Sequence, residues 1–350
     1  KLITQLFGDR MYIANATGCS SIWGNSSPST PYTANKAGKG PAWSNSLFED
    51  NAEFGYGMLL AQQAIRDGLK AKVEEVAANE NATAEVKAAC QEWLDTFGVG
   101  ATNGAATDKL VAALENVDCP TCKDIVKNKD FLAKKSQWIF GGDGWAYDIG
   151  FNGVDHVLAS GKDINIMVFN TEVYSNTGGQ SSKATPTGAV AQFAAGGKEV
   201  KQKDLAAIAM SYGYVYVAQI SMGADMNQTI KAIAEAEAYP GPSLIIAYAP
   251  CINHGIKKGM AKAQTEEKLA VQSGYWNLFR FNPAAEGKKF SLDCKPATVD
   301  YQEFIKGEVR YTSLALKNPA RAEKLFAKAE QNAKDKYAYL EKLVTLYDEK

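Results

Sequence analysis

Short apolar runs alternate with helix-like segments over residues 138–248. The runs Ile164–Phe169 and Ser243–Tyr248 are strand-sized and almost wholly apolar, which is typical of parallel strands buried on both faces. Further strands are predicted at Met11–Ala14, Trp138–Phe140 and Tyr214–Gln219, and helices at Tyr147–Ala159, Asp204–Tyr212 and Ala224–Ala238. The face of the last helix that packs on the sheet is expected to carry Met226, Ile230, Ile233 and Ala234. The pattern predicts an α/β fold, a parallel sheet with helices on both faces.

The composition changes over about residues 60–135. This stretch is rich in Ala, Glu, Lys and Leu and poor in β-branched residues, as helices are. Three or four helices are predicted, one beginning at Asn81 or Thr83 and one capped by Asp118. We expect a helical insertion within a domain that spans residues 1–315.

The end of the chain is predicted to form one long helix. Asn318 is a good N-cap, and Pro319 suits the first helical position. The apolar stripe of this helix consists of Phe326, Ala329, Ala333, Tyr337, Leu340 and Val344. We expect residues 316–350 to form a C-terminal helical extension that packs on the body or on a partner subunit.

Composition and charge exclude several classes of protein. The chain is 46% hydrophobic and 22% charged, which is typical of globular proteins. It has 38 basic and 39 acidic residues, so the clustered positive charge that nucleic acids require is not expected. The apolar runs fall short of the roughly 20 residues of a membrane helix.

The 6 cysteines form no regular framework, so we expect a cytoplasmic protein. It begins in mid-pattern at Lys1 without signal-peptide features, and we expect it to be part of a longer chain.

The strand at Trp138–Phe140 is followed by Gly141-Gly142-Asp143-Gly144. Glycines let backbone N–H groups approach a ligand, and the N-terminus of the next helix attracts an anion. A carboxylate beside a phosphate would be repelled unless a divalent cation joined them, and Mg²⁺ binds both kinds of oxygen. The alternative is a glycine-rich turn with a capping Asp.

The next predicted strand ends in Asn170-Thr171, 27 positions after Asp143. One helix and one strand fit in that interval, so both motifs are expected at the same edge of neighbouring strands. The Thr171 hydroxyl and a nearby carbonyl could complete a Mg²⁺ site. Gly-Asp-Gly followed about thirty residues later by Asn resembles the signature of thiamine diphosphate enzymes, in which most members have a second Asn where this chain has Thr171.

Two cysteines lie near predicted ligand sites. Cys19 opens the aperiodic stretch 17–50, and Cys251 directly follows a strand. Long aperiodic loops are usually functional, but an iron–sulfur cluster needs four ligands and a buried free thiol is the commoner state. Cys119 and Cys122 have C-x-x-C spacing, but they lie in the helical insertion.

Several segments together resemble the pyruvate:ferredoxin (flavodoxin) oxidoreductases. They are residues 16–24, 40–50, 141–150, 155–161, 170–180 and 307–311. Over nearly its whole length the chain resembles the C-terminal thiamine diphosphate-binding domain of that family. The resemblance implies an enzyme that oxidatively decarboxylates pyruvate to acetyl-CoA and CO₂ and passes electrons through iron–sulfur clusters to ferredoxin or flavodoxin.

The resemblance also assigns residues to the thiamine diphosphate site. It implies that Mg²⁺ is held by Asp143, Thr171 and the Val173 carbonyl. The diphosphate would be lined by Gly142, Gly144 and Trp145. The Glu that activates thiamine and the Arg that binds the pyruvate carboxylate are expected outside this segment, so the segment alone is expected to be inactive.

The family's remaining features concern the cluster and the partners. Cys19 and Cys251 would ligate the [4Fe–4S] cluster nearest the thiamine, with the other ligands outside this chain, and Asn176 would contact the substrate. No role is implied for Cys90, Cys119, Cys122 and Cys294. The implied partners are the rest of the same polypeptide or companion subunits, pyruvate, coenzyme A, and ferredoxin or flavodoxin, in a homodimer.

Three alternatives remain open from the sequence. The first is a thiamine diphosphate-dependent 2-oxoacid decarboxylase, which would keep Asp143 and Thr171 but not need Cys19 and Cys251. The second is an oxidoreductase for another 2-oxoacid. The third is a non-catalytic binding domain that retains the fold.

Overall fold

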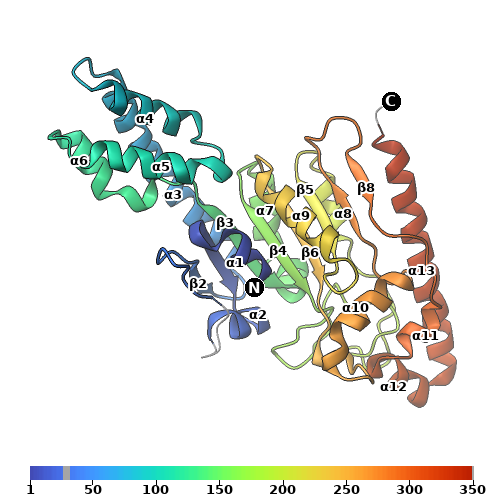
Figure 1. Cartoon of the computed structure of the whole chain (residues 1–350). Coiled ribbons are helices and arrows are strands. Elements are labelled where there is room, and N and C mark those ends of the chain that lie inside the picture. Colours follow the sequence, from blue (N-terminus) through green and yellow to red (C-terminus); the bar gives the residue numbers. More distant parts are fainter. Residues whose placement is uncertain (27–31, 349–350) are drawn as a thin grey trace. The chain divides into compact units, whose positions relative to one another are not determined.

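The computed structural model describes residues 1–26 and 32–348, and its main element is an eight-stranded sheet (Figure 1). The strand order is β2-β1-β3-β4-β6-β5-β7-β8. The strands are β1 Met11–Ala16, β2 Ala42–Ser46, β3 Ser136–Gly142, β4 Asn165–Asn170, β5 Tyr216–Ile220, β6 Ser243–Tyr248, β7 Phe279–Phe281 and β8 Phe290–Leu292. Strands β3, β4, β6 and β5 pair in parallel, and β7 and β8 continue the sheet antiparallel. The predicted α/β class is confirmed.

The central strands are covered on both faces. Successive side chains of a strand point to opposite faces, and Leu244, Ile245 and Ile246 of β6 are 0%, 0% and 1% exposed. The helices between the parallel strands are α7 Phe151–Ala159, α8 Leu205–Met210 and α9 Met226–Ala238. Near-continuous apolar runs therefore form parallel strands here because both faces need apolar side chains.

The predicted apolar face of α9 is partly wrong. Ile233 is buried, but Met226 and Ile230 are 43% and 37% exposed, and Ala234 is exposed. The buried residues are Gln228, Thr229, Ala232, Ile233 and Ala236. The buried face thus combines Ile233 with small and polar side chains, and it is rotated away from Met226 and Ile230.

The contacts divide the described chain into two compact units. The smaller comprises 1–13, 32–42 and 54–137, and the larger comprises the rest. The smaller unit contains α1 Leu2–Phe7, most of α3 Asn51–Ala78, α4 Ala84–Asp95, α5 Gly100–Leu114 and α6 Pro120–Lys127. The predicted helices of the insertion are therefore present, and they share a core of their own around Trp93 and Leu110.

The starts of two of these helices were predicted to be capped. Thr83 caps α4, its side chain accepting a hydrogen bond from the Val86 N–H at 3.3 Å, as expected. The N-cap of α6 is Cys119 and not Asp118. The Asp118 carboxylate instead forms an exposed ion pair with Lys123.

The carboxyl-terminal part of the larger unit is helical. Its helices are α10 Ala263–Gln272, α11 Tyr301–Ile305, α12 Val309–Lys317 and α13 Pro319–Leu346. Asn318 caps α13, as predicted, by accepting from the Arg321 N–H. Phe326, Ala329 and Leu340 of the predicted stripe are buried, and α13 contacts α11, α12 and β8. The helix therefore packs on the body of its unit, whereas a domain boundary at residue 315 stays a prediction.

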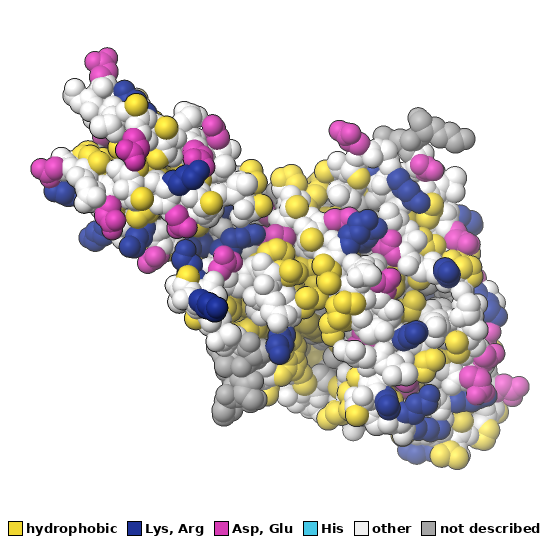
Figure 2. Space-filling model, viewed as in Figure 1, with side chains coloured by type: hydrophobic (Ala, Val, Ile, Leu, Met, Phe, Trp, Pro, Cys, Tyr) yellow, Lys and Arg dark blue, Asp and Glu magenta, His cyan; other side chains and the backbone are white. Residues whose placement is uncertain are grey.

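The stretch 17–50, expected to be aperiodic, contains some regular structure. It includes the short helix α2 Cys19–Ser21, a π-helical turn at Ile22–Ser26 and strand β2, while residues 27–31 lie outside the described part. Figure 2 shows basic and acidic side chains interspersed on the visible face. Across residues 1–26 and 32–348, no helix combines the length and apolar content needed to cross a membrane.

Candidate metal and cofactor site

Asp143 lies at the carboxyl end of β3, where a π-helical turn (Gly144–Ile149) begins. Its side chain is 0% exposed. Oδ1 accepts hydrogen bonds from the Thr171 N–H at 3.1 Å and the Thr171 hydroxyl at 2.9 Å, and Oδ2 accepts from the Ser182 hydroxyl at 2.5 Å. The structure thus brings Asp143 and Thr171 together, as the strand spacing predicted.

The three oxygens expected to bind Mg²⁺ converge at this point. The Thr171 hydroxyl oxygen lies 2.9 Å from Asp143 Oδ1 and 3.0 Å from the Val173 carbonyl oxygen. A hydroxyl has one proton, so it can donate to only one of these two acceptors at a time. Crowded oxygens of this kind are suited to a hard cation, which takes carboxylate, hydroxyl and carbonyl ligands together.

The Asp143 carboxyl group lies in an unfavourable place for a negative charge. Burial raises the pKa of Asp143 to about 6, because the hydrogen bonds from Ser182 and Thr171 offset only part of the desolvation and the nearby Glu172 carboxylate opposes ionisation further. A bound divalent cation would favour the ionised form. The residues present therefore fit Mg²⁺.

The candidate site is not built from the side chains that hold most structural metals. Within the described part of the chain, no group of three or more His, Cys, Asp or Glu residues could hold a metal ion. Here a single carboxylate is combined with a hydroxyl and a carbonyl oxygen. Mg²⁺ is commonly bound in this way, with few protein ligands and with phosphate oxygens from the substrate or cofactor.

The glycines of the turn have different roles. A Cβ on Gly144 would lie 2.7 Å from the Tyr174 ring, whereas one on Gly142 would meet nothing closer than 3.8 Å. Trp145 is 0% exposed, and a Cβ on Gly141 would lie 2.3 Å from its indole ring. The Trp145 side chain is therefore part of the core, so only its backbone could line a diphosphate.

The two candidate cluster cysteines lie near one loop. The Ser175 hydroxyl donates to Cys19 Sγ at 3.2 Å and also interacts with the Cys251 thiol. Cys19 Sγ lies 3.9 Å from Asn176 Oδ1, and the Asn253 N–H donates to Cys251 Sγ at 3.5 Å. Burial raises the pKa of the Cys251 thiol. Residues 232 positions apart are thus brought together beside Asn176, while Cys119 and Cys122 belong to the smaller unit.

Sequence reasoning missed a network of buried charges behind the candidate metal site. Glu172, His254 and Glu308 are 0% exposed and Arg310 is 3% exposed. Arg310 donates to Glu172 Oε2 and to Glu308 Oε2, both at 2.7 Å. The signal in the sequence was indirect: Glu308 and Arg310 lie in the segment 307–311 and Glu172 lies in the segment 170–180, and both segments contributed to the family resemblance without a role assigned to these residues.

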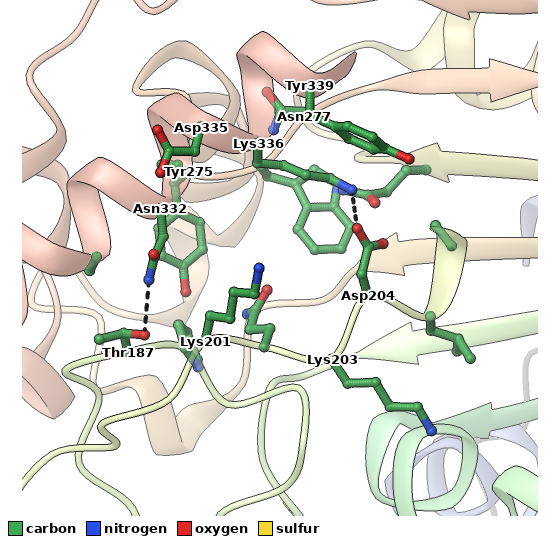
Figure 3. A pocket seen from close by; sticks show the side chains of 18 of the residues that line it. Thr187, Lys201, Lys203, Asp204, Tyr275, Asn277, Asn332, Asp335, Lys336 and Tyr339 are labelled. Atoms are coloured by element: carbon green, nitrogen blue, oxygen red, sulfur yellow. Dashed lines mark hydrogen bonds and ion pairs between the residues drawn. The ribbon is translucent and has the colours of Figure 1, made fainter. Parts of the chain in front are cut away.

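A cavity of about 450 Å³ is lined by residues that contact this network (Figure 3). Tyr275 and Gln202 line it, and both donate hydrogen bonds to Glu172. Figure 3 shows Lys201 pointing into this space, with the Asn332–Thr187 hydrogen bond and the Lys336–Asp204 ion pair at its sides. Asp143, Thr171 and Val173 are not among its lining residues, so the cavity is separate from the candidate metal site.

Comparisons with known proteins place the chain among thiamine pyrophosphate enzymes. Residues 126–247, which include Asp143, Thr171 and Val173, match the family "Thiamine pyrophosphate enzyme, C-terminal TPP binding domain". The chain is 55% identical to pyruvate-flavodoxin oxidoreductase of Klebsiella pneumoniae and 57% identical to pyruvate:ferredoxin oxidoreductase of Moorella thermoacetica, in each case over 98% of its own length. The expected family resemblance is confirmed.

The chain is much shorter than these relatives. It spans 30% of the length of each of the two. A solved structure of 2-oxoglutarate:ferredoxin oxidoreductase from Magnetococcus marinus, with 2-oxoglutarate, coenzyme A and succinyl-CoA bound, aligns with 70% of this chain and 56% of its own. The TM-score is 0.39 and the identity 13%.

Proposed function

We propose that this chain is the part of a pyruvate:ferredoxin (flavodoxin) oxidoreductase that binds the Mg²⁺–diphosphate end of thiamine diphosphate. The observation that carries the proposal is the convergence of Asp143, the Thr171 hydroxyl and the Val173 carbonyl at the carboxyl ends of β3 and β4. Ligands of parallel α/β sheets bind at this edge. The match to the thiamine pyrophosphate-binding family covers the same residues.

The residues of this chain position the cofactor. Asp143, Thr171 and Val173 would hold Mg²⁺, and the backbone around Gly142, with its open space, would accept the diphosphate oxygens. Bound thiamine diphosphate supplies the electron sink for removing CO₂ from a 2-oxoacid. Asn176, beside Cys19, is proposed to contact the substrate.

Cys19 and Cys251 are proposed as two of the four ligands of a [4Fe–4S] cluster. Their shared neighbour Ser175 supports this assignment, because ligands of one cluster must lie close together. The other ligands would come from outside this chain. Pyruvate and coenzyme A are the proposed substrates in a cytoplasmic homodimer. Ferredoxin or flavodoxin is the proposed acceptor, and relatives at 55% and 57% identity are named for different acceptors.

The metal assignment is tested by metal and thiamine content in the full-length protein. Asp143→Asn removes the carboxylate while keeping its size, and we expect the variant to lose Mg²⁺ and thiamine diphosphate on gel filtration. Asp118→Asn is the matched control, since the side chain of Asp118 is 94% exposed. Full retention of both ligands by Asp143→Asn would show the proposal to be wrong.

The cluster assignment is tested by iron and sulfide content. Cys251→Ser is expected to lower both, whereas Cys119→Ser is expected to leave both unchanged. A decarboxylase without clusters is the competing function. Unchanged iron in Cys251→Ser would refute the cluster assignment, whereas absence of iron and sulfide from the unaltered protein, together with thiamine loss in Asp143→Asn, would favour that decarboxylase.

A further inference from the structure

The turn that follows β4 and carries Thr171 and Val173 has an unusual backbone conformation. Glu172, between Thr171 and Val173, has a φ angle of 61°. This is a left-handed backbone conformation that residues other than Gly rarely adopt. Its side chain is 0% exposed. A buried non-glycine residue keeps such a conformation only where its surroundings fix it.

Four donors fix Glu172 in this position. Its Oε2 accepts from Arg310 at 2.7 Å and from the Tyr275 hydroxyl at 2.6 Å, and its Oε1 accepts from Gln202 at 3.0 Å. Its carbonyl oxygen accepts from the Thr185 hydroxyl at 2.6 Å. The carboxylate is therefore occupied by Arg310, Tyr275 and Gln202, and it makes no hydrogen bond to the Thr171 hydroxyl, which interacts with Asp143 and with the Val173 carbonyl.

The main donor, Arg310, is itself held in place. Its Nε donates to Glu308 Oε2 at 2.7 Å. Segments 255–257 and 307–309 pair through backbone hydrogen bonds, which brings His254 beside Glu308 at 3.5 Å. His254 Nε2 lies 2.7 Å from the carbonyl oxygen of Thr171. The same buried network thus contacts the turn at Thr171 and at Glu172.

We propose that Glu172, held by Arg310, is a positioning residue that sets the affinity of the turn for its cation. The inference rests on the proposed function, because it takes Thr171 and Val173 as cation ligands. Groups that orient metal ligands commonly change affinity 10- to 100-fold when replaced. Glu172 supplies no ligand oxygen, so its effect would come entirely from holding the two neighbours.

The experiment is a titration of the metal-free full-length protein with Mn²⁺, followed by electron paramagnetic resonance, in the presence of thiamine diphosphate. Glu172→Gln removes the charge that Arg310 holds. Glu172→Gly also removes the side chain but accepts the left-handed backbone without strain. Glu303→Gln is the matched control, since its side chain is 71% exposed.

We expect both Glu172 variants to bind Mn²⁺ about 10- to 100-fold more weakly than the unaltered protein, and Glu303→Gln to bind it normally. Because all three ligand oxygens remain, activity in the Glu172 variants is expected to recover at saturating Mg²⁺, as a raised apparent KM for the metal with kcat kept. Normal Mn²⁺ affinity in Glu172→Gly would overturn the inference, since backbone conformation alone would then suffice.

Two further results separate this inference from the proposed function. If excess metal fails to restore activity and the peptide that contains the turn exchanges its amide hydrogens freely, Glu172 is needed for folding only, and the inference is wrong. Asp143→Asn in the same titration tests the site itself. Normal Mn²⁺ binding in Asp143→Asn would refute the proposed function, whereas weak binding there with normal binding in Glu172→Gln would refute only the inference.

Discussion

Replacing Arg310 with Met should strongly destabilise the larger unit. Arg310 is 3% exposed and is the cation between two buried carboxylates, Glu172 and Glu308. Met is unbranched like the aliphatic part of Arg but has no charge. The replacement leaves two negative charges without their counter-ion in a place that water does not reach.

The size of the effect follows from that burial. Removing one partner of a buried ion pair costs about 3–5 kcal/mol, because the remaining charge is uncompensated. At about 1.4 kcal/mol for each factor of ten, core amides that exchange by unfolding of the unit should exchange about 100- to 4,000-fold faster. Strand β6, in the middle of the sheet, reports this change best.

The assay is amide hydrogen exchange of the full-length protein, read in the peptide that covers Ser243–Tyr248. Arg321→Met is the matched control. Arg321 is 39% exposed and lies 3.5 Å from Glu199, and an exposed pair contributes about 0–1 kcal/mol. Exchange in Arg310→Met within about fivefold of the unaltered protein would refute the reasoning.

The loss of stability in Arg310→Met should also depend on pH. Burial alone would raise the pKa of Glu308, but Arg310 and His254 outweigh it and lower the pKa. A lowered folded-state pKa contributes stability above the unfolded value that is lost as the pH falls through the folded value. In Arg310→Met the Glu308 carboxylate can instead take up a proton as the pH falls. The difference between the two proteins is therefore expected to be largest at pH 8 and to shrink toward pH 5.

The remaining predictions concern single positions. Gly141→Ala would place a Cβ 2.3 Å from the Trp145 ring, and such overpacking costs about 1–3 kcal/mol, measurable as faster exchange in β3. Gly142→Ala meets nothing closer than 3.8 Å, so we expect normal exchange but weaker thiamine diphosphate binding by calorimetry. Thr83→Ala removes the cap of α4 and should cost about 1 kcal/mol, seen as faster exchange in its first turn. Equal exchange in the two glycine variants, or an unchanged first turn of α4, would contradict these expectations.

The parallel strands could be predicted from the sequence because strands that are buried on both faces consist of nearly continuous apolar residues. The run at residues 243–248 and the spacing from Asp143 to Asn170 were sufficient to place two ends of neighbouring strands together. Strands β7 and β8 were missed because each has only three residues, too few to show a period. The face of α9 was misjudged because the polar residues Gln228 and Thr229 are buried, while Met226 and Ile230 are exposed.

Some residues of the candidate site could likewise be predicted from the sequence and others could not. Asp143 and Thr171 occur in a local motif, so their chemistry could be read from neighbouring residues. Glu172 and Arg310 are separated by 138 positions, and nothing in either segment indicates that they pair. Contacts of that range depend on the folded topology, and a single sequence does not record them.

The turn at Ile252–His254 has a consequence for how the protein would be assembled in the cell. Its N-cap is Cys251, a proposed iron ligand, and its last residue is His254, whose Nε2 lies 2.7 Å from the Thr171 carbonyl oxygen. Loading of iron and retention of the vitamin-derived cofactor are therefore expected to be linked. Protein made under iron starvation should release thiamine diphosphate during purification, and low occupancy in such a preparation would then indicate poor iron supply to the producing cells.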